Sequence, residues 1–176
     1  DVERSRGLGD VYKRQMMDIY TVSFFGHRVI HDFSTTERQA ELLIHNLLLE
    51  KEYIEFMVGR DGDFDQMISS IVRRLKRLVR DDNSSLTWVL PYPTANLRDN
   101  QESFEEYYDA IEICDTAARS HPKSAFQIRN RWIVDHSDMV VFYVDHKGGG
   151  AYQTLRYAQK KNKSYVNLAD YARSAP

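Results

Sequence analysis

The chain alternates short apolar runs, rich in β-branched and aromatic residues, with longer stretches in which apolar residues recur about every 3.6 positions. The apolar runs predict strands at 19–25, 52–58, 86–90, 139–144 and 164–168. The sequence leaves open a further short strand within 107–113. The periodic stretches predict helices that begin near Ser34 and that occupy 64–80, 125–136 and about 151–161. This alternation predicts an α/β fold: a Rossmann-like, three-layer domain with a mostly parallel sheet and helices on both faces.

Two segments do not follow this alternation. Residues 1–15 have no strand or helix period and lead directly into Met16 and Met17. We expect them to be a non-native extension, with a genuine disordered arm as the alternative, and we expect residues 16–176 to form a single domain. Residues 94–110 are polar and aromatic, and they predict a lid-like insertion with one short helix.

Charge and cysteine content limit the partners and the compartment. The formal net charge is −2, so there is no overall positive field to attract nucleic acid, and we do not expect nucleic acid as a partner. No apolar run reaches the roughly 18 residues that a membrane-spanning helix needs, so we expect no membrane association. Cys114 is the single cysteine, which favours a reducing, cytoplasmic location. An exposed sheet edge or the aromatic insertion could support a homo-oligomer.

Three glycine-containing loops follow predicted strands. Parallel strands place such loops at one edge of the sheet, where glycine amides and helix N-termini can bind a phosphate. Asp65 could accept a hydrogen bond from a ribose hydroxyl or cap the second helix, and each glycine could instead serve a tight turn. The loop residues that we predict to bind a ligand are Gly26, His27, Arg28, Gly59, Gly62, Asp65, Asp145, Gly148, Gly149 and Gly150.

A basic cluster, Arg129-Asn130-Arg131, lies in the predicted helix before the most apolar strand. Arginine can bind a phosphate with two parallel hydrogen bonds, so we add all three residues to the candidate ligand site. The alternative is an ordinary charged helix face in which the arginines pair with Asp135 and Asp138.

Motifs of established catalytic chemistry are missing from the sequence. It contains no CxxC, HExxH, GxSxG or GxxxxGK[ST] pattern, and its six histidines have no metal-ligand spacing. We therefore expect no metal and no cofactor, and the sequence identifies no catalytic residue.

The three loops resemble motifs of a known superfamily. Residues 23–28 (SFFGHR) are similar to a "TGHR"-type first loop, and residues 59–65 are similar to a "GGAxGxD" loop. Arg129-Asn130-Arg131, with Ser137-Asp138 and the Gly148–Gly150 run, is similar to "RNRxxxxxSD…GG". On these motifs the chain resembles the SLOG superfamily (the Smf/DprA–LOG group), and within it the YpsA-like branch of uncharacterised bacterial proteins.

The resemblance implies a Rossmann-like fold and ligand binding by the matched loop residues. It favours a domain that binds or senses a nucleotide or a nucleotide derivative. One alternative is a nucleoside-monophosphate N-glycosidase, because Arg129 falls where the phosphoribohydrolases of the superfamily have an active-site arginine. Those enzymes carry a glutamate where this chain has Leu155, so Asp65 or Asp145 would have to assist. A second alternative is a binder of single-stranded nucleic acid, with Tyr92, Tyr107 and Tyr108 stacking on bases.

Overall fold

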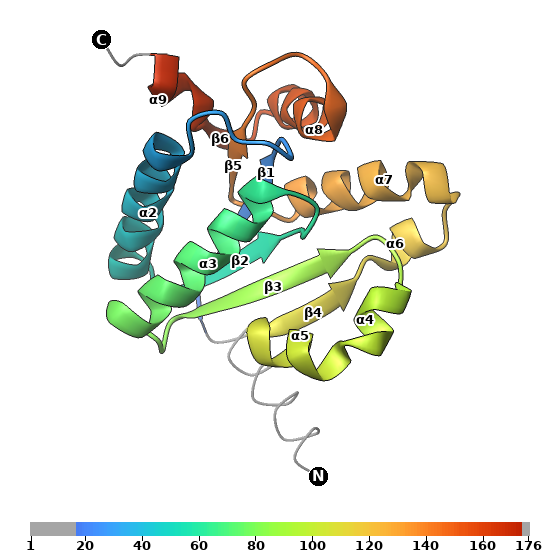
Figure 1. Cartoon of the computed structure of the whole chain (residues 1–176), viewed down its shortest axis with the longest axis horizontal. Coiled ribbons are helices and arrows are strands. Elements are labelled where there is room, and N and C mark those ends of the chain that lie inside the picture. Colours follow the sequence, from blue (N-terminus) through green and yellow to red (C-terminus); the bar gives the residue numbers. More distant parts are fainter. Residues whose placement is uncertain (1–16, 174–176) are drawn as a thin grey trace.

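The computed structural model describes residues 17–173, and the predicted N-terminal extension, 1–15, lies outside the described residues. Six parallel strands form one sheet in the order β4-β3-β2-β1-β5-β6 (Figure 1). The strands are β1 (Ile19–Gly26), β2 (Tyr53–Val58), β3 (Ser84–Leu90), β4 (Ala110–Ile113), β5 (Met139–Tyr143) and β6 (Ser164–Asn167). The helices are α2 (Phe33–Glu50), α3 (Asp63–Leu78), α4 (Ala95–Asp99), α5 (Gln101–Tyr107), α6 (Asp115–Ala118), α7 (Pro122–Asp135), α8 (Gly149–Lys160) and α9 (Ala169–Arg173).

The strand order places a topological switch beside β1. The chain moves outward from β1 through β2 and β3 to β4, and then returns to add β5 and β6 on the other side of β1. Loops that leave β1 and β5 therefore diverge to opposite sides, which opens a crevice at the carboxyl ends of these strands.

Apolar residues fill both faces of the sheet. Neighbouring strand residues point to opposite faces, so Phe24 packs in a core with α2 and α3, whereas Phe25 packs in a second core with α7 and α8. Phe56 and Met57 of β2 divide between the two cores in the same way. Helices on both faces of a parallel sheet confirm the predicted α/β, Rossmann-like class.

Several local predictions differ from the structure. The helix predicted to begin near Ser34 is α2, which begins at Phe33; its buried stripe runs through Ala40, Ile44, Leu47 and Leu48 and leaves Leu42 56% exposed. Residues 94–110 contain two short helices, α4 and α5, where one was predicted, since Asn100 ends the first and caps the second. The short helices α6 and α9 were not predicted, because helices of four and five residues are too short to show an apolar period.

Within residues 17–173, no helix combines the length and the apolar character that crossing a membrane requires.

Candidate functional site

A cavity of about 360 Å³ opens at the carboxyl ends of the strands, beside the switch between β1 and β5. Most of the predicted ligand residues meet there, although they come from four separate segments of the chain. From the predicted set, the cavity is lined by Gly26, His27, Arg28, Gly59, Asp65, Arg129, Asn130, Gly149 and Gly150. The other lining residues are Phe24, Phe25, Asp61, Phe126, Gln127 and Ala151.

Tight packing joins the first two loops. The Asp63 amide donates to the Arg28 carbonyl at 2.9 Å, and a Cβ built on Gly62 would lie 2.6 Å from Arg28 Cα. A Cβ on Gly26 would lie 2.3 Å from the ring of Phe64. Gly26 and Gly62 are therefore required for the contact between loops, and Gly62 does not line the cavity.

The third loop differs, because its first two glycines are free of such contacts, whereas a Cβ on Gly150 would lie 3.3 Å from Gln127 Nε2. Gly148 and Gly149 have positive φ angles of 148° and 78°, which side-chain-bearing residues rarely adopt, and a Cβ on either would meet nothing within 4 Å. Gly148 is the N-cap residue of α8, and no side chain hydrogen-bonds to this cap. The first turn of α8 thus presents backbone amides and the positive end of the helix dipole beside the cavity.

Arg129 lies in the cavity wall and is 5% exposed. Its Nε and Nη2 donate to Asn130 Oδ1 at 3.1 and 2.9 Å, and its Nη1 donates to the Val89 carbonyl at 3.1 Å. Asn130 is fixed in turn, since its Nδ2 donates to Thr154 Oγ1 at 3.1 Å. A guanidinium has five N–H donors, so one N–H on each terminal nitrogen remains for a ligand. Asp61, whose side chain is 43% exposed, approaches Nη2 at 3.5 Å.

Asp65 does not cap α3; Gly62 occupies that position. Its Oδ2 accepts a hydrogen bond from the Asp61 amide at 2.9 Å. Burial of the carboxyl raises the pKa of Asp65 to about 6; the hydrogen bond from Asp61 and the charge of Arg129 oppose this rise, and the Asp61 charge adds to it. The cavity therefore holds a carboxyl group that loses its proton near pH 6.

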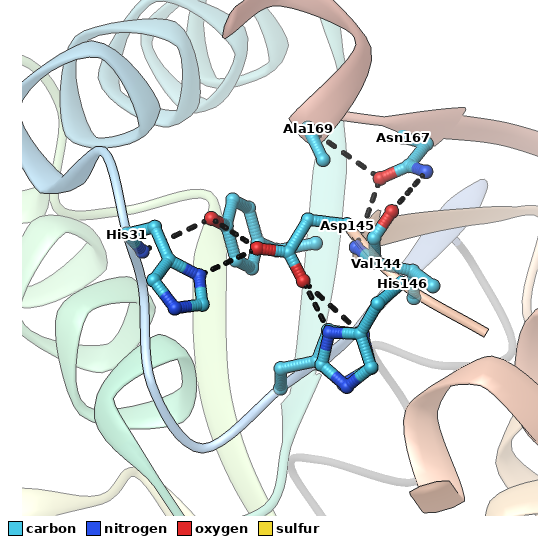
Figure 2. A network of polar contacts seen from close by, with 8 residues as sticks. His31, Val144, Asp145, His146, Asn167 and Ala169 are labelled. Carbon is cyan, nitrogen blue, oxygen red and sulfur yellow. Dashed lines mark hydrogen bonds and ion pairs between the residues drawn. The ribbon is translucent and has the colours of Figure 1, made fainter. Parts of the chain in front are cut away.

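Asp145 lies outside the cavity lining, in a cluster with three histidines. Its Oδ2 lies 2.7 Å from His31 Nδ1, and its Oδ1 lies 2.6 Å from His146 Nδ1 and 3.7 Å from His27 Nε2. Figure 2 shows His31 and His146 on either side of the Asp145 carboxylate. Sequence spacing could not reveal this cluster, because His27 and Asp145 meet only through the pairing of β1 with β5.

Arg131 also lies outside the cavity lining. It is exposed, and its guanidinium lies 5.3 Å from the centre of the Tyr157 ring. The proposed pairing of the arginines with Asp135 and Asp138 differs from the contacts found. Asp135 accepts hydrogen bonds from the Tyr157 hydroxyl, and Asp138 accepts one from the Thr21 amide.

Sequence reasoning missed Phe126 and Gln127, which precede Arg129 by three and two residues and line the same cavity. Residues three apart on a helix share a face, so the position of Arg129 would have indicated Phe126. Asp61 was also missed, although it lies inside the predicted 59–65 loop.

No protein-family model matches the sequence, and no curated protein matches it. Solved structures do match. DNA processing protein A from Streptococcus pneumoniae superposes with a TM-score of 0.61 at 14% identity, over 84% of this chain and 49% of that chain. The chain has the fold of the matched part of DNA processing protein A. The protein of that name from Helicobacter pylori gives a TM-score of 0.58 at 14% identity, over 88% of this chain and 71% of that chain.

The chain spans about half the length of the Streptococcus pneumoniae DNA processing protein A. The shared fold agrees with the SLOG-type, Rossmann-like fold that the sequence motifs imply, and it does not distinguish the YpsA-like branch. That branch stays a prediction.

The expectation that nucleic acid is not a partner is wrong. The Helicobacter pylori DNA processing protein A is described by its single-stranded DNA binding mode, and it has the fold found here. A net charge of −2 does not exclude such a partner, because whole-chain charge averages over the surface, whereas binding depends on charges at one site.

Proposed function

We propose that the cavity binds a nucleotide through a phosphate group. The observation that carries this proposal is that the uncapped amino end of α8 and the buried Arg129 guanidinium border the same cavity. Backbone amides at a helix N-terminus favour anions, and an arginine with remaining donors can bind phosphate oxygens. A volume of about 360 Å³ lies in the range of roughly 300–1,000 Å³ typical of small-ligand sites.

The assignment to the YpsA-like branch and the cytoplasmic location belong to this proposal. The matched loops support the first, since they supply most of the cavity wall. The buried, unpaired Cys114 is compatible with a reducing compartment.

A matched pair of arginine variants tests the phosphate contact. Arg28 is exposed and lines the cavity, whereas Arg131 is exposed and lies away from it. Both Arg28→Gln and Arg131→Gln remove one positive charge. We expect Arg28→Gln to weaken binding of nucleoside monophosphates by about tenfold, the worth of one exposed charge-assisted hydrogen bond, and Arg131→Gln to leave it unchanged. Equal effects of the two variants, measured by calorimetric titration, would refute a phosphate site in the cavity.

A second candidate function is the binding of single-stranded nucleic acid. The single-stranded DNA binding mode described for the Helicobacter pylori DNA processing protein A supports it, and Phe126 supports it by position. Phe126 is 39% exposed at the cavity, contacts the Tyr92 ring edge-to-face at 5.9 Å, and lies 5.1 Å from the Arg129 guanidinium carbon. An exposed aromatic ring beside a phosphate site can stack on a base.

Fluorescence anisotropy with a labelled single strand distinguishes the two candidates. For a strand-binding protein, we expect affinity to fall steeply with salt and Phe126→Ala to weaken it, since stacking is worth about 1–3 kcal/mol per base. Binding of free nucleotides without binding of the strand would leave only the first candidate. Chromatography of the same nucleotide mixtures would detect released base, the product of the N-glycosidase alternative.

A further inference from the structure

The geometry points to a binding site for a divalent transition-metal ion, such as Zn²⁺, formed by His27, Asp145 and His146. One ligand atom of each residue lies within 4.8 Å of the ligand atoms of the other two. Imidazole nitrogen and carboxylate oxygen are ligands that Zn²⁺ and its neighbours in the first transition row prefer. The three residues form a metal-binding set that the sequence spacing did not reveal.

The sheet brings these residues together. Gly26 of β1 pairs with Tyr143 of β5, and the His27 amide donates to the Tyr143 carbonyl at 3.1 Å. His27 therefore follows β1 at the level where Asp145 and His146 follow β5. Two rigid neighbouring strands fix the backbone on both sides of the site, which limits the reorganisation that ion binding requires.

A second, independent observation is an unpartnered nitrogen that belongs to His27. The residue is 9% exposed, and its Nε2 is buried without a hydrogen-bond partner. A neutral imidazole nitrogen has a lone pair that can bind a metal. A bound ion would satisfy a polar atom that is otherwise costly to bury.

Asp145 is oriented for this role. The contacts from His31 at 2.7 Å and from the Tyr143 hydroxyl at 3.2 Å both fall on Oδ2, so Oδ1 faces His27 and His146. The hydrogen bonds from His31 and Tyr143 thus hold the carboxylate in place, as outer-sphere hydrogen bonds hold ligands in known metal sites.

The distances leave room for an ion after one side-chain movement. Two ligands of a tetrahedral Zn²⁺ lie about 3.4 Å apart, given bonds near 2.1 Å. The 3.7 Å from His27 Nε2 to Asp145 Oδ1 is close to this value, whereas the 2.6 Å from His146 Nδ1 to Asp145 Oδ1 must lengthen. The His27 and His146 rings stack at 3.8 Å, so one ring must turn to bring the ion into both ring planes. His146 is 59% exposed and can make this turn.

Calorimetric titration of Zn²⁺ into the untagged full chain, after chelator treatment, tests the site without any nucleotide. We expect one ion per chain near pH 7.5, and weaker binding near pH 5.5, where protons compete for imidazole. His146→Gln should lower the affinity at least about tenfold, because it removes a ligand from an exposed position without disturbing the core. The control is His45→Gln, since His45 lies in α2, outside the metal-binding set.

An NMR measurement adds a readout at the buried ring. In spectra of ¹⁵N-labelled histidine, Zn²⁺ should shift the His27 Nε2 resonance in the wild type and leave His45 unchanged. Binding that His146→Gln does not weaken, or a His27 resonance that Zn²⁺ does not shift, would overturn the proposal. Wild-type affinity weaker than millimolar would do the same. None of these outcomes depends on phosphate binding in the cavity, so the two proposals fail separately.

Discussion

Replacing Asp65 with asparagine should stabilise the protein, and the gain should grow with pH. The folded protein holds the pKa of Asp65 at about 6, against 3.8 for an ordinary aspartate, chiefly because the carboxyl is buried. The folded state thus binds this proton more tightly than the unfolded state does. The contribution of Asp65 to stability is intact below about pH 3.8, falls as the pH rises toward 6, and stays low above that.

The size of the effect follows from the two pKa values. A difference of about 2.2 units corresponds to about 3 kcal/mol between the fully protonated and fully ionised limits. Between pH 5 and pH 8, the unfolding free energy of the wild type should fall by about 1.5 kcal/mol relative to that of Asp65→Asn. The amide oxygen of asparagine can still accept the hydrogen bond that the Asp61 amide donates at 2.9 Å, so the local backbone contact survives.

Urea denaturation, followed by the fluorescence of Trp88 and Trp132, measures this difference at each pH. The matched control is Asp63→Asn, because Asp63 is an exposed aspartate in the same helical turn and its replacement changes the net charge equally. We expect the Asp65→Asn advantage to rise between pH 5 and pH 8 beyond any change in the Asp63→Asn difference. An Asp65→Asn difference that does not change with pH would refute the reasoning.

Three further predictions concern the same loops. Gly26→Ala should destabilise the fold by about 2–4 kcal/mol in urea denaturation, because its Cβ would overlap the Phe64 ring. Protonation of His27 should destabilise the folded state, since its pKa is lowered from 6.5; stability should fall as the pH falls below 6.5, and His27→Gln should flatten this dependence. Asp61→Asn should strengthen phosphate binding about threefold to tenfold in calorimetric titration, because it removes an anion 3.5 Å from Arg129.

The edge of the sheet at which the candidate site lies could be predicted from the sequence, because a parallel sheet leaves little freedom in where its loops lie. Once strands alternate with helices, the loops after Gly26, Gly59 and Val144 must lie at one edge of the sheet. The cavity there is lined by residues of all three loops or of the helices that follow them. Periodicity was enough for this level of structure.

The role of each glycine could not be predicted in the same way. Gly26 and Gly62 follow strands as Gly149 does, yet they accommodate Phe64 and Arg28, while Gly149 has no neighbour that a Cβ would meet. The difference depends on side chains that arrive from other segments, which no local pattern encodes. The same reason hid the proposed metal-binding set, whose histidines come from separate strand ends.

The loop after β1 is the structural link between the two proposed sites. β1 lies between β2 and β5, so its loop can contact both the loop that follows β2 and the loop that follows β5. Arg28 packs against Gly62 on one side, and His27 faces Asp145 on the other. A divalent ion held by His27 would bring positive charge to the edge of a cavity that contains Asp61 and Asp65, two carboxylates that oppose an anionic ligand. Arg28 belongs to this loop and packs against Gly62, whereas His146 lies in the loop after β5, so their variants separate the contribution of the ion from the contribution of the arginine.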